Sequence, residues 1–335
     1  NKKTLGALLI TKDGAFTASN ELGDTPGLTL TSEDETNSYT YRNSGSLGTF
    51  IHNNGEVEFA AGTTTIAQGF TASNPLYDMT VNSAPIDLYL YGDTLVCNDL
   101  KFKAGDMLFD GNQGDITVSG NFEIGEVGTS RFGLGGAFDN NQTLTFGVLH
   151  IYSNGTFNAT SGTTTIDNNI GGQSIFNLDG GTFVHNSGTV NLLQGTGDPE
   201  LTGTADINPT FWNFNTGFSY IKRGMTVENS MNTAPVGYGG GACNVYTSEP
   251  IVFGTDSQSG HLDLTTNTGI KMTNGTNNVS GASAIYPMQI TSSTKFDFHS
   301  RITNIANADF LGGSNLDDAC TVNATNLQFL DTLTI

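Results

Sequence analysis

The sequence predicts an all-β protein, a β-solenoid (β-helix) built from duplicated short-strand repeats, and three observations support this fold class. The segment GTFIHNNGEVEF at residues 48–59 recurs as GTFVHNSGTVNL at residues 181–192. Glycines recur at every seventh position around both copies, which leaves room for one short strand and its turn. These periods contain Thr, Val, Phe and Asn instead of the Ala, Leu, Glu and Lys of a helical heptad. Stacked strand–turn units of this kind form solenoids.

Residues 1–40 are predicted to be an entry or cap segment. They contain one apolar stretch at residues 5–10, an Asp13–Gly14 turn and a polar run at residues 31–37. Two lysines before the apolar stretch resemble the start of a signal peptide, but the stretch is too short and no small-residue cleavage site follows it. We therefore do not interpret this segment as a secretion signal.

Residues 41–235 are predicted to form the duplicated solenoid. Around residues 56–59, apolar and acidic residues alternate with the period of two that is typical of a strand buried on one side. The segments PLYDMTVN at 75–82 and PTFWNFN at 209–215 are also related, so the duplicated unit is long. We expect Glu56 and Glu58 to face outward. Six side chains are expected to face the core: Phe50, Val57, Phe59, Phe183, Val190 and Leu192.

Residues 236–335 are predicted to continue the solenoid or to pack as a small β domain. The glycine-rich segment 237–241 marks the boundary, and strand signals resume beyond it. The last residues are apolar, and a final rung with such side chains would need a cover. We therefore expect a homo-oligomer, a trimer, with this end at a subunit contact. The residues behind this expectation are Leu327, Phe329, Leu330, Leu333 and Ile335.

The composition argues against several classes of partner. Twelve basic and 32 acidic residues give a net charge of −20, which would repel a nucleic-acid backbone. No apolar run reaches the length of about 18 residues that a membrane-spanning helix needs. Cys97, Cys243 and Cys320 are far apart and show no paired metal-ligand spacing, so we interpret them as buried thiols.

The histidines are the first candidates for chemistry. His52 and His185 occupy the same position in the two copies of the repeat, where an imidazole could bind a metal or could hydrogen-bond to the turn. We favour the structural role, because a histidine at a turn more often satisfies backbone carbonyls than binds a metal. His150, His261 and His299 have no partner at a recognisable spacing and stay unassigned.

Carboxylates are the second candidates. Neighbouring rungs could bring Asp106, Asp110 and Asp115 within the separation that a hydrolytic site requires, although turn carboxylates normally bind solvent or backbone. Asp and Asn at these turns could instead hold calcium, but no EF-hand spacing is present. We predict no catalytic residue, no enzymatic activity and no cofactor other than possible calcium, and we leave the metal ligands unknown.

Trp212 is the only tryptophan, and Tyr77 is its counterpart in the first copy. Exposed aromatic side chains of this kind can stack on sugar rings. Because the position is repeated, we predict a packing role in the core instead.

The motif GTF[IV]HN[NS]G, followed by a strand and a YDMTVN-like segment, resembles the solenoid repeats of bacteriophage fibre, spike and head-decoration proteins and of bacterial surface adhesins. The resemblance covers roughly residues 41–230 and brings no catalytic residue with it. It implies a rigid, often trimeric structural or adhesive component on a virion surface, in contact with other virion proteins and with host-surface glycans. A bacterial extracellular adhesin and a polysaccharide-degrading tailspike are the alternatives.

Overall fold

The computed structural model confirms an all-β solenoid: every element assigned in the described residues is a strand, and the strands pair in parallel. The structure describes residues 3–5, 8–10, 15–20, 27–31, 41–43, 49–60, 65–68, 75–90, 94–108, 114–134, 141–167, 176–193, 199–204, 208–216 and 219–232, and short strands between 243 and 334. Side chains beyond residue 229 and in parts of the earlier ranges lie outside this description.

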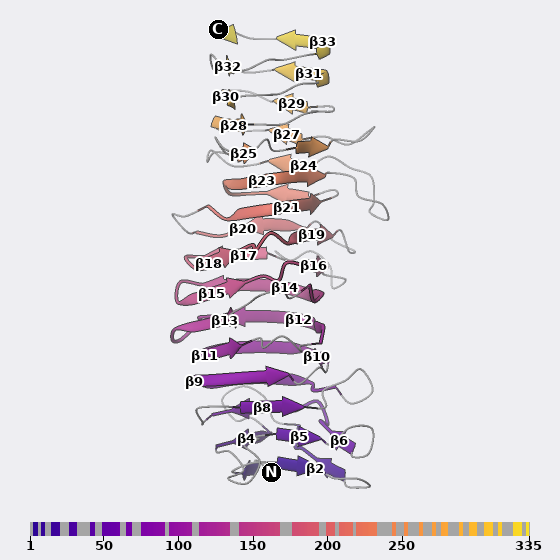
Figure 1. The fold of residues 1–335 in the computed structure, drawn as a ribbon, viewed down its shortest axis with the longest axis vertical. Helices are drawn as coiled ribbons and strands as arrows, with labels where there is room; N and C mark the ends of the chain where they lie inside the picture. The colour runs from indigo at the N-terminus through magenta and orange to yellow at the C-terminus, as the bar shows by residue number, and fades with distance from the viewer. Residues whose placement is uncertain are drawn as a thin grey trace. The chain divides into compact units, whose positions relative to one another are not determined.

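The strands follow one another closely along the chain (Figure 1). The first are β1 (Lys3–Leu5), β2 (Leu8–Ile10), β3 (Ala15–Thr17), β4 (Leu28–Leu30), β5 (Tyr41–Asn43), β6 (Thr49–Ile51), β7 (Glu56–Phe59), β8 (Thr65–Gln68), β9 (Asp78–Leu90), β10 (Leu95–Cys97), β11 (Asp99–Leu108), β12 (Ile116–Ile124), β13 (Ser130–Leu134), β14 (Leu144–Tyr152), β15 (Gly155–Asn158), β16 (Thr163–Asp167) and β17 (Phe176–Asp179). They continue with β18 (Thr182–Val184), β19 (Thr189–Leu193), β20 (Glu200–Thr202), β21 (Thr210–Thr216), β22 (Ser219–Ile221), β23 (Met225–Asn232), β24 (Cys243–Val245), β25 (Ile251–Phe253), β26 (His261–Asp263), β27 (Ile270–Met272), β28 (Thr276–Ser280), β29 (Met288–Ile290), β30 (Lys295–His299), β31 (Ile305–Phe310), β32 (Ser314–Leu316), β33 (Ala324–Phe329) and β34 (Leu333–Thr334).

The chain divides into two compact units. The first comprises residues 1–164 and 178–183, and the second comprises residues 165–177 and 184–335. The first copy of the repeated segment, residues 48–59, lies in the first unit. Residues 184–192 of the second copy lie in the second unit, and residues 181–183 belong to the first.

In the first unit, one parallel ladder runs through β1, β4, β7, β9, β11, β12 and β14. Equivalent residues along the chain pair at separations of 25, 29, 22, 21, 22 and 27 residues, which is the length of one turn of the coil. The side chains stack in a column from one turn to the next, as a solenoid requires. This column contains Leu5, Leu30, Phe59, Val81, Phe102, Ile124 and Ile151.

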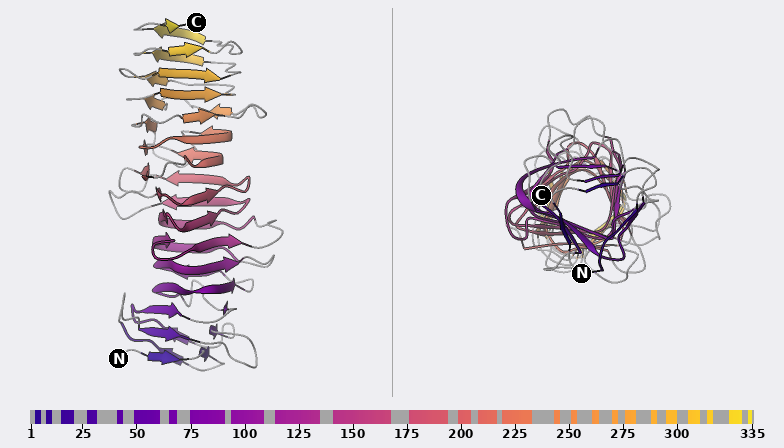
Figure 2. Two further views of the ribbon diagram at one scale, coloured as in Figure 1. Left: turned by 90° about the vertical axis from the view of Figure 1, so that its left-hand side faces the viewer. Right: turned by 90° about the horizontal axis from the view of Figure 1, so that it is seen from below.

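Two further ladders complete the coil of the first unit. One pairs Leu88 with Met107, Met107 with Phe132 and Phe132 with Phe157. The other joins β10, β12 and β14. Long strands such as β9 and β11 take part in two ladders because they bend around a corner of the coil. Viewed from below, the strands of this unit wind around a common interior (Figure 2).

Phenylalanine side chains fill the interior of the first unit. Phe122, Phe132, Phe146 and Phe157 are fully buried, with ring centroids 4.8–5.8 Å apart in each contacting pair. Burying such a side chain stabilises the fold by about 1.5–3 kcal/mol. The predicted core is confirmed, because the exposed fraction of each predicted inward side chain is at most 8%: Phe50, Val57, Phe59, Phe183, Val190 and Leu192.

The second unit repeats the same construction. One ladder runs through β17, β20, β22, β24, β27, β29, β31 and β33. A second joins β19, β21, β23 and β26. Val190 pairs with Phe214 as Val57 pairs with Met79, so each copy of the repeat is followed by an equivalent rung.

Glu56 corrects one prediction, because it is buried and only 5% exposed, whereas Glu58 is half-buried. The alternation of residues along a strand determines on which face of the sheet a side chain lies. It does not determine whether another part of the chain covers that face. Glu56 pairs in register with Asp78 of the next turn, so that strand lies directly beside it.

Several predictions fall outside the described residues. They concern Asp110, the glycine-rich boundary at 237–241, the side chains of His261 and His299 and those of Cys243 and Cys320. The apolar C-terminal side chains also lie outside, although the backbone of β33 and β34 is described.

Candidate functional site: the outer faces of the coil

The first repeat turns a corner at residues 52–55. Asn53 and Asn54 both have positive φ, 51° and 57°, and the Gly55 N–H donates to the His52 carbonyl oxygen at 2.9 Å. This is a type I′ turn, which asparagine and glycine favour. The Asn54 N–H donates to His52 Nδ1 at 2.9 Å, so the imidazole adds a second hydrogen bond within the turn. A Cβ on Gly55 would lie 1.8 Å from the Ser19 carbonyl oxygen, which explains the glycine.

The second repeat builds the same corner with the same hydrogen bonds. Asn186 and Ser187 have φ values of 45° and 60°, and the Gly188 N–H donates to the His185 carbonyl oxygen at 2.9 Å. The Ser187 N–H donates to His185 Nδ1 at 2.9 Å. The expected equivalence of the two histidines and their structural role at the turn are therefore confirmed. Their partner differs from the expected backbone carbonyl, because each Nδ1 accepts a backbone N–H.

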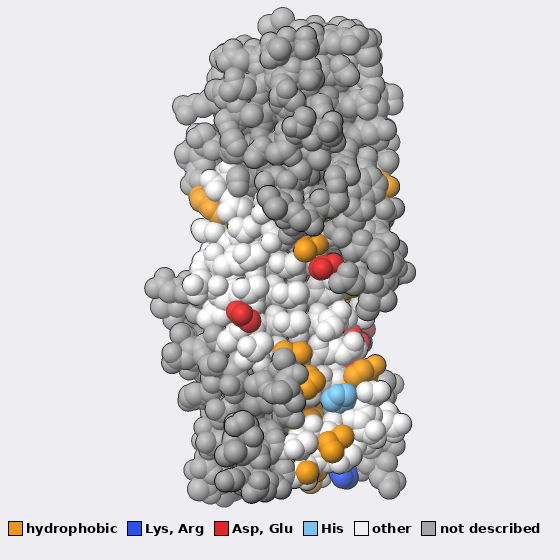
Figure 3. All heavy atoms as spheres, turned by 90° about the vertical axis from the view of Figure 1, so that its right-hand side faces the viewer, with side chains coloured by type: hydrophobic (Ala, Val, Ile, Leu, Met, Phe, Trp, Pro, Cys, Tyr) orange, Lys and Arg blue, Asp and Glu red, His pale blue; other side chains and the backbone are white. Residues whose placement is uncertain are grey.

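An aromatic ring from the next turn of the coil stacks on each of these histidines. The centroid separation is 5.7 Å between His52 and Tyr77 and 6.1 Å between His185 and Trp212, with 20° between the ring planes in both pairs. On the face drawn in Figure 3, hydrophobic side chains gather beside a histidine on a surface that is otherwise mostly uncharged in its described part. The histidine and the aromatic ring thus form one surface corner in each unit.

The predicted core role of Trp212 is wrong. Trp212 and Tyr77 are only half-buried, and Phe211 and Leu76 occupy the interior beside them. The pairing of β21 with β23 shifts register between Phe211 and Asn213, which leaves Trp212 outside the core. A bulge of this kind breaks strict alternation, so the sequence pattern could not locate it.

The two corners differ in one neighbour. His185 Nε2 lies 3.3 Å from Glu228 Oε2. In the first unit, the residue opposite Tyr77 is Asn98, whose N–H donates to the Tyr77 carbonyl oxygen at 2.6 Å. The side-chain amide of Asn98 donates to Asp78 Oδ1 at 3.1 Å.

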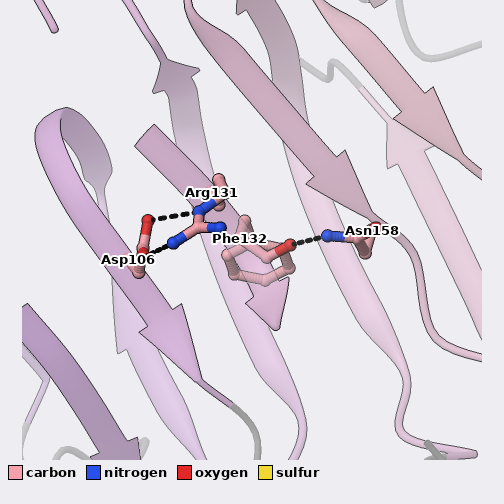
Figure 4. Close-up of polar contacts among 4 residues, drawn as sticks. All are labelled: Asp106, Arg131, Phe132 and Asn158. Atoms are coloured by element: carbon pink, nitrogen blue, oxygen red, sulfur yellow. Dashed lines mark hydrogen bonds and ion pairs between the residues drawn. The ribbon is translucent and has the colours of Figure 1, made fainter. Parts of the chain in front are cut away.

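The carboxylates considered for hydrolysis have separate roles. Asp106 is 9% exposed, and Arg131 holds it through two hydrogen bonds: Nε donates to Oδ1 at 3.0 Å, and Nη2 donates to Oδ2 (Figure 4). This hydrogen bonding raises the pKa of Arg131. Both oxygens of the Asp106 carboxylate are therefore engaged by one guanidinium group. Asp115 is exposed and accepts the Thr143 N–H at 2.8 Å, and Asp110 lies outside the described residues.

A column of charged side chains crosses the outer face of the first unit. Lys101 pairs in register with Glu123, and Glu123 with His150. Lys101 Nζ lies 3.0 Å from Glu123 Oε2, and His150 Nε2 lies 2.8 Å from Asp179 Oδ2. Burial lowers the pKa of Lys101, but the hydrogen bond and charge of Glu123 outweigh this and raise it. Sequence spacing gave no signal for His150, because its partners come from other turns of the coil.

Tyr152 lies beside this column. Its ring stacks on His150 at 3.7 Å between centroids, and burial followed by the charge of Glu123 raises its pKa. Its neighbours in the adjacent turns are glycines: Gly180 forms a bridge with it, and Gly125 follows the register partner of Ile151. In each adjacent turn, the residue at the position beside Tyr152 is therefore a glycine, and Tyr152 itself is half-buried.

A second column at a corner is acidic. Glu56 pairs with Asp78, and Asp78 with Asp99. Asp78 Oδ1 accepts the Asn98 side-chain amide at 3.1 Å and the Asp99 N–H at 3.2 Å. Burial raises the pKa of Asp78 in spite of these bonds, and the charge of Asp99 adds to the effect. Burial also raises the pKa of the Cys97 thiol, which is 2% exposed, as the sequence predicted for a structural cysteine.

Among the described residues, no group of three or more His, Cys, Asp and Glu side chains could hold a metal ion. The described part of the chain also contains no helix long and apolar enough to cross a membrane. No protein-family model, curated protein or solved structure matches the chain.

Proposed function

We propose that this protein is a non-enzymatic structural or adhesive component of a virion surface, such as a tail fibre, a spike or a capsid decoration. The observation that carries the proposal is the fixed array of polar side chains on the outer faces. Parallel register places equivalent groups in columns, and neighbouring turns are joined by Lys101–Glu123, by His150–Asp179 and by the amide pair Asn215 and Asn191, 2.9 Å apart. A fully buried aromatic core beneath these columns suits a rigid scaffold that holds its outer side chains in fixed positions.

The Tyr152 region is the proposed contact surface for a host-surface glycan. The C–H face of a sugar ring stacks on an aromatic ring, and its hydroxyl groups need both donors and acceptors. Lys101 and Glu123 offer one of each, held together at 3.0 Å, and glycines occupy the positions beside Tyr152 in the adjacent turns. This arrangement supports glycan binding by surface contact without chemistry.

Binding to intact host cells tests this contact. Tyr152→Ala should weaken binding of the purified protein about tenfold or more, because removal of a central aromatic contact typically costs over about 1.4 kcal/mol. Tyr220→Ala removes a half-buried tyrosine of the second unit and should leave binding unchanged. Equal binding by wild type and Tyr152→Ala, with both folded by circular dichroism, would overturn the assignment of the contact.

Immunogold imaging tests the location. Antibody against the protein should label the surface of intact virions, whereas labelling of uninfected cells alone would identify a bacterial adhesin. Incubation with capsular polysaccharide should release no new reducing ends. Release of reducing ends would identify a degrading spike and contradict the non-enzymatic proposal.

Self-association as a trimer stays part of the proposal. Light scattering on the purified protein at micromolar concentration should give three times the mass of the 335-residue chain. A monomer at that concentration would remove the trimer from the proposal and leave the fold unaffected.

A further inference from the structure

We propose that the two histidine corners are acid-sensitive elements, in which protonation of His52 or His185 opens the type I′ turn that the histidine closes. This inference concerns a conformational response and goes beyond the structural or adhesive role. It rests on a hydrogen bond found twice, in which a backbone N–H donates to Nδ1 at 2.9 Å.

The hydrogen bond defines the protonation state of each imidazole. A neutral histidine has one nitrogen that accepts and one that donates, whereas the imidazolium ion donates from both. Because Asn54 and Ser187 each donate an N–H to Nδ1, the acceptor nitrogen carries no proton and Nε2 carries it. Uptake of a proton from solvent at Nδ1 places two donors face to face and removes the bond.

Loss of this bond acts on a tight turn of the backbone. Two consecutive residues have left-handed φ values at each corner, a conformation that asparagine tolerates and that Ser187 adopts less readily. At the first corner the backbone passes so close to Ser19 that a Cβ on Gly55 would lie 1.8 Å from its carbonyl oxygen. The bond from the Gly55 N–H to the His52 carbonyl oxygen does not involve the imidazole and is not removed by its protonation.

The groups that face the histidines make the two corners unequal. Tyr77 stacks on His52, Asn98 lies opposite Tyr77, and the nearest charged residue along the chain is Glu56. At the second corner, Glu228 lies 3.3 Å from His185 Nε2 and Trp212 covers the ring. The two corners therefore differ in the charge that lies beside the imidazole.

Amide hydrogen exchange, followed by NMR at pH 7.5 and at pH 5, tests the opening. After correction for intrinsic rates, protection of the Ser187 and Asn54 amides should fall about 2- to 13-fold in acid, the change expected for loss of one net hydrogen bond. His185→Gln should make the Ser187 protection independent of pH, because glutamine does not titrate. Equal protection at both pH values in wild type would overturn the proposal, as would a fall that persists in His185→Gln.

Tryptophan fluorescence provides a second measurement on the same corner. Trp212 is the only tryptophan in the chain and stacks on His185, so its emission reports on the second corner. Emission should change with pH across the range in which histidines titrate, about pH 5–8. The change should disappear in His185→Gln and persist in His52→Gln. Emission that does not respond to pH in wild type would refute the protonation step, even if a variant failed to fold.

Discussion

Replacement of Phe132 by alanine should lower the free energy of unfolding by about 4–5 kcal/mol. A buried Phe→Ala substitution typically costs about 3–5 kcal/mol. Phe132 should lie at the upper end because it is fully buried and its ring contacts three others: Phe157 at 4.8 Å, Phe122 at 5.0 Å and Phe102 at 6.3 Å between centroids. Each such pair contributes about 0.5–1.5 kcal/mol beyond the area it buries.

Urea unfolding followed by circular dichroism measures this loss. Phe132→Leu keeps most of the volume and should cost less than about 1.5 kcal/mol. Ile51→Ala is the surface control, because Ile51 is 46% exposed, and it should cost about 1 kcal/mol or less. If Phe132→Ala cost less than about 1.5 kcal/mol while the denaturant slope stayed unchanged, the stacked phenylalanines would not hold the coil together.

Three further predictions concern the corners. Burial raises the pKa of Asp78, so the folded state binds a proton more tightly than the unfolded state, and this residue costs stability as pH rises above the ordinary Asp value of about 3.9. In urea titrations, the free energy of unfolding of Asp78→Asn should therefore rise relative to that of wild type as the pH increases from 3 to 7. If the difference between the two proteins were the same at both pH values, the raised pKa of Asp78 would be contradicted. Gly125→Ala should cost about 1–3 kcal/mol or prevent folding, because φ is 82° and a Cβ would lie 2.0 Å from the Gly155 nitrogen. Gly128→Ala is the control, because a Cβ there would lie no closer than 3.3 Å to another atom. In thermal unfolding it should lose less stability than Gly125→Ala, and equal losses in the two variants would refute the steric reasoning. Cys97 should resist alkylation until the protein is unfolded, as measured by mass spectrometry of its peptide, and labelling of the native protein would disprove its burial.

The fold class was predictable because a solenoid is specified by sequence patterns that extend over only a few residues. A glycine at every seventh position and strict alternation at Val57 and Phe59 constrain only neighbouring residues, and these constraints already predict short strands with one buried face. The duplication then predicts that His52 and His185 occupy equivalent corners, which the two turns confirm. Sequence reasoning succeeded wherever the controlling interaction lies within one strand and its turn.

The outer surface depended on contacts between turns of the coil. His150 meets Asp179 and Asp106 meets Arg131 across 29 and 25 residues, and no spacing rule predicts a pair whose separation varies from turn to turn. Trp212 left the core because a register shift interrupts the alternation. Glu56 is buried because the next turn covers it.

The sequence by itself therefore determined the class of fold, the corners and the inward face, because period and turn chemistry act over a few residues. Only the tertiary structure decided which outward side chains meet, which ones are covered and which histidines have a carboxylate partner. The physical reason is that parallel register brings together residues that are 21–29 positions apart in the sequence. Because the turns of the coil differ in length, this separation changes from one turn to the next.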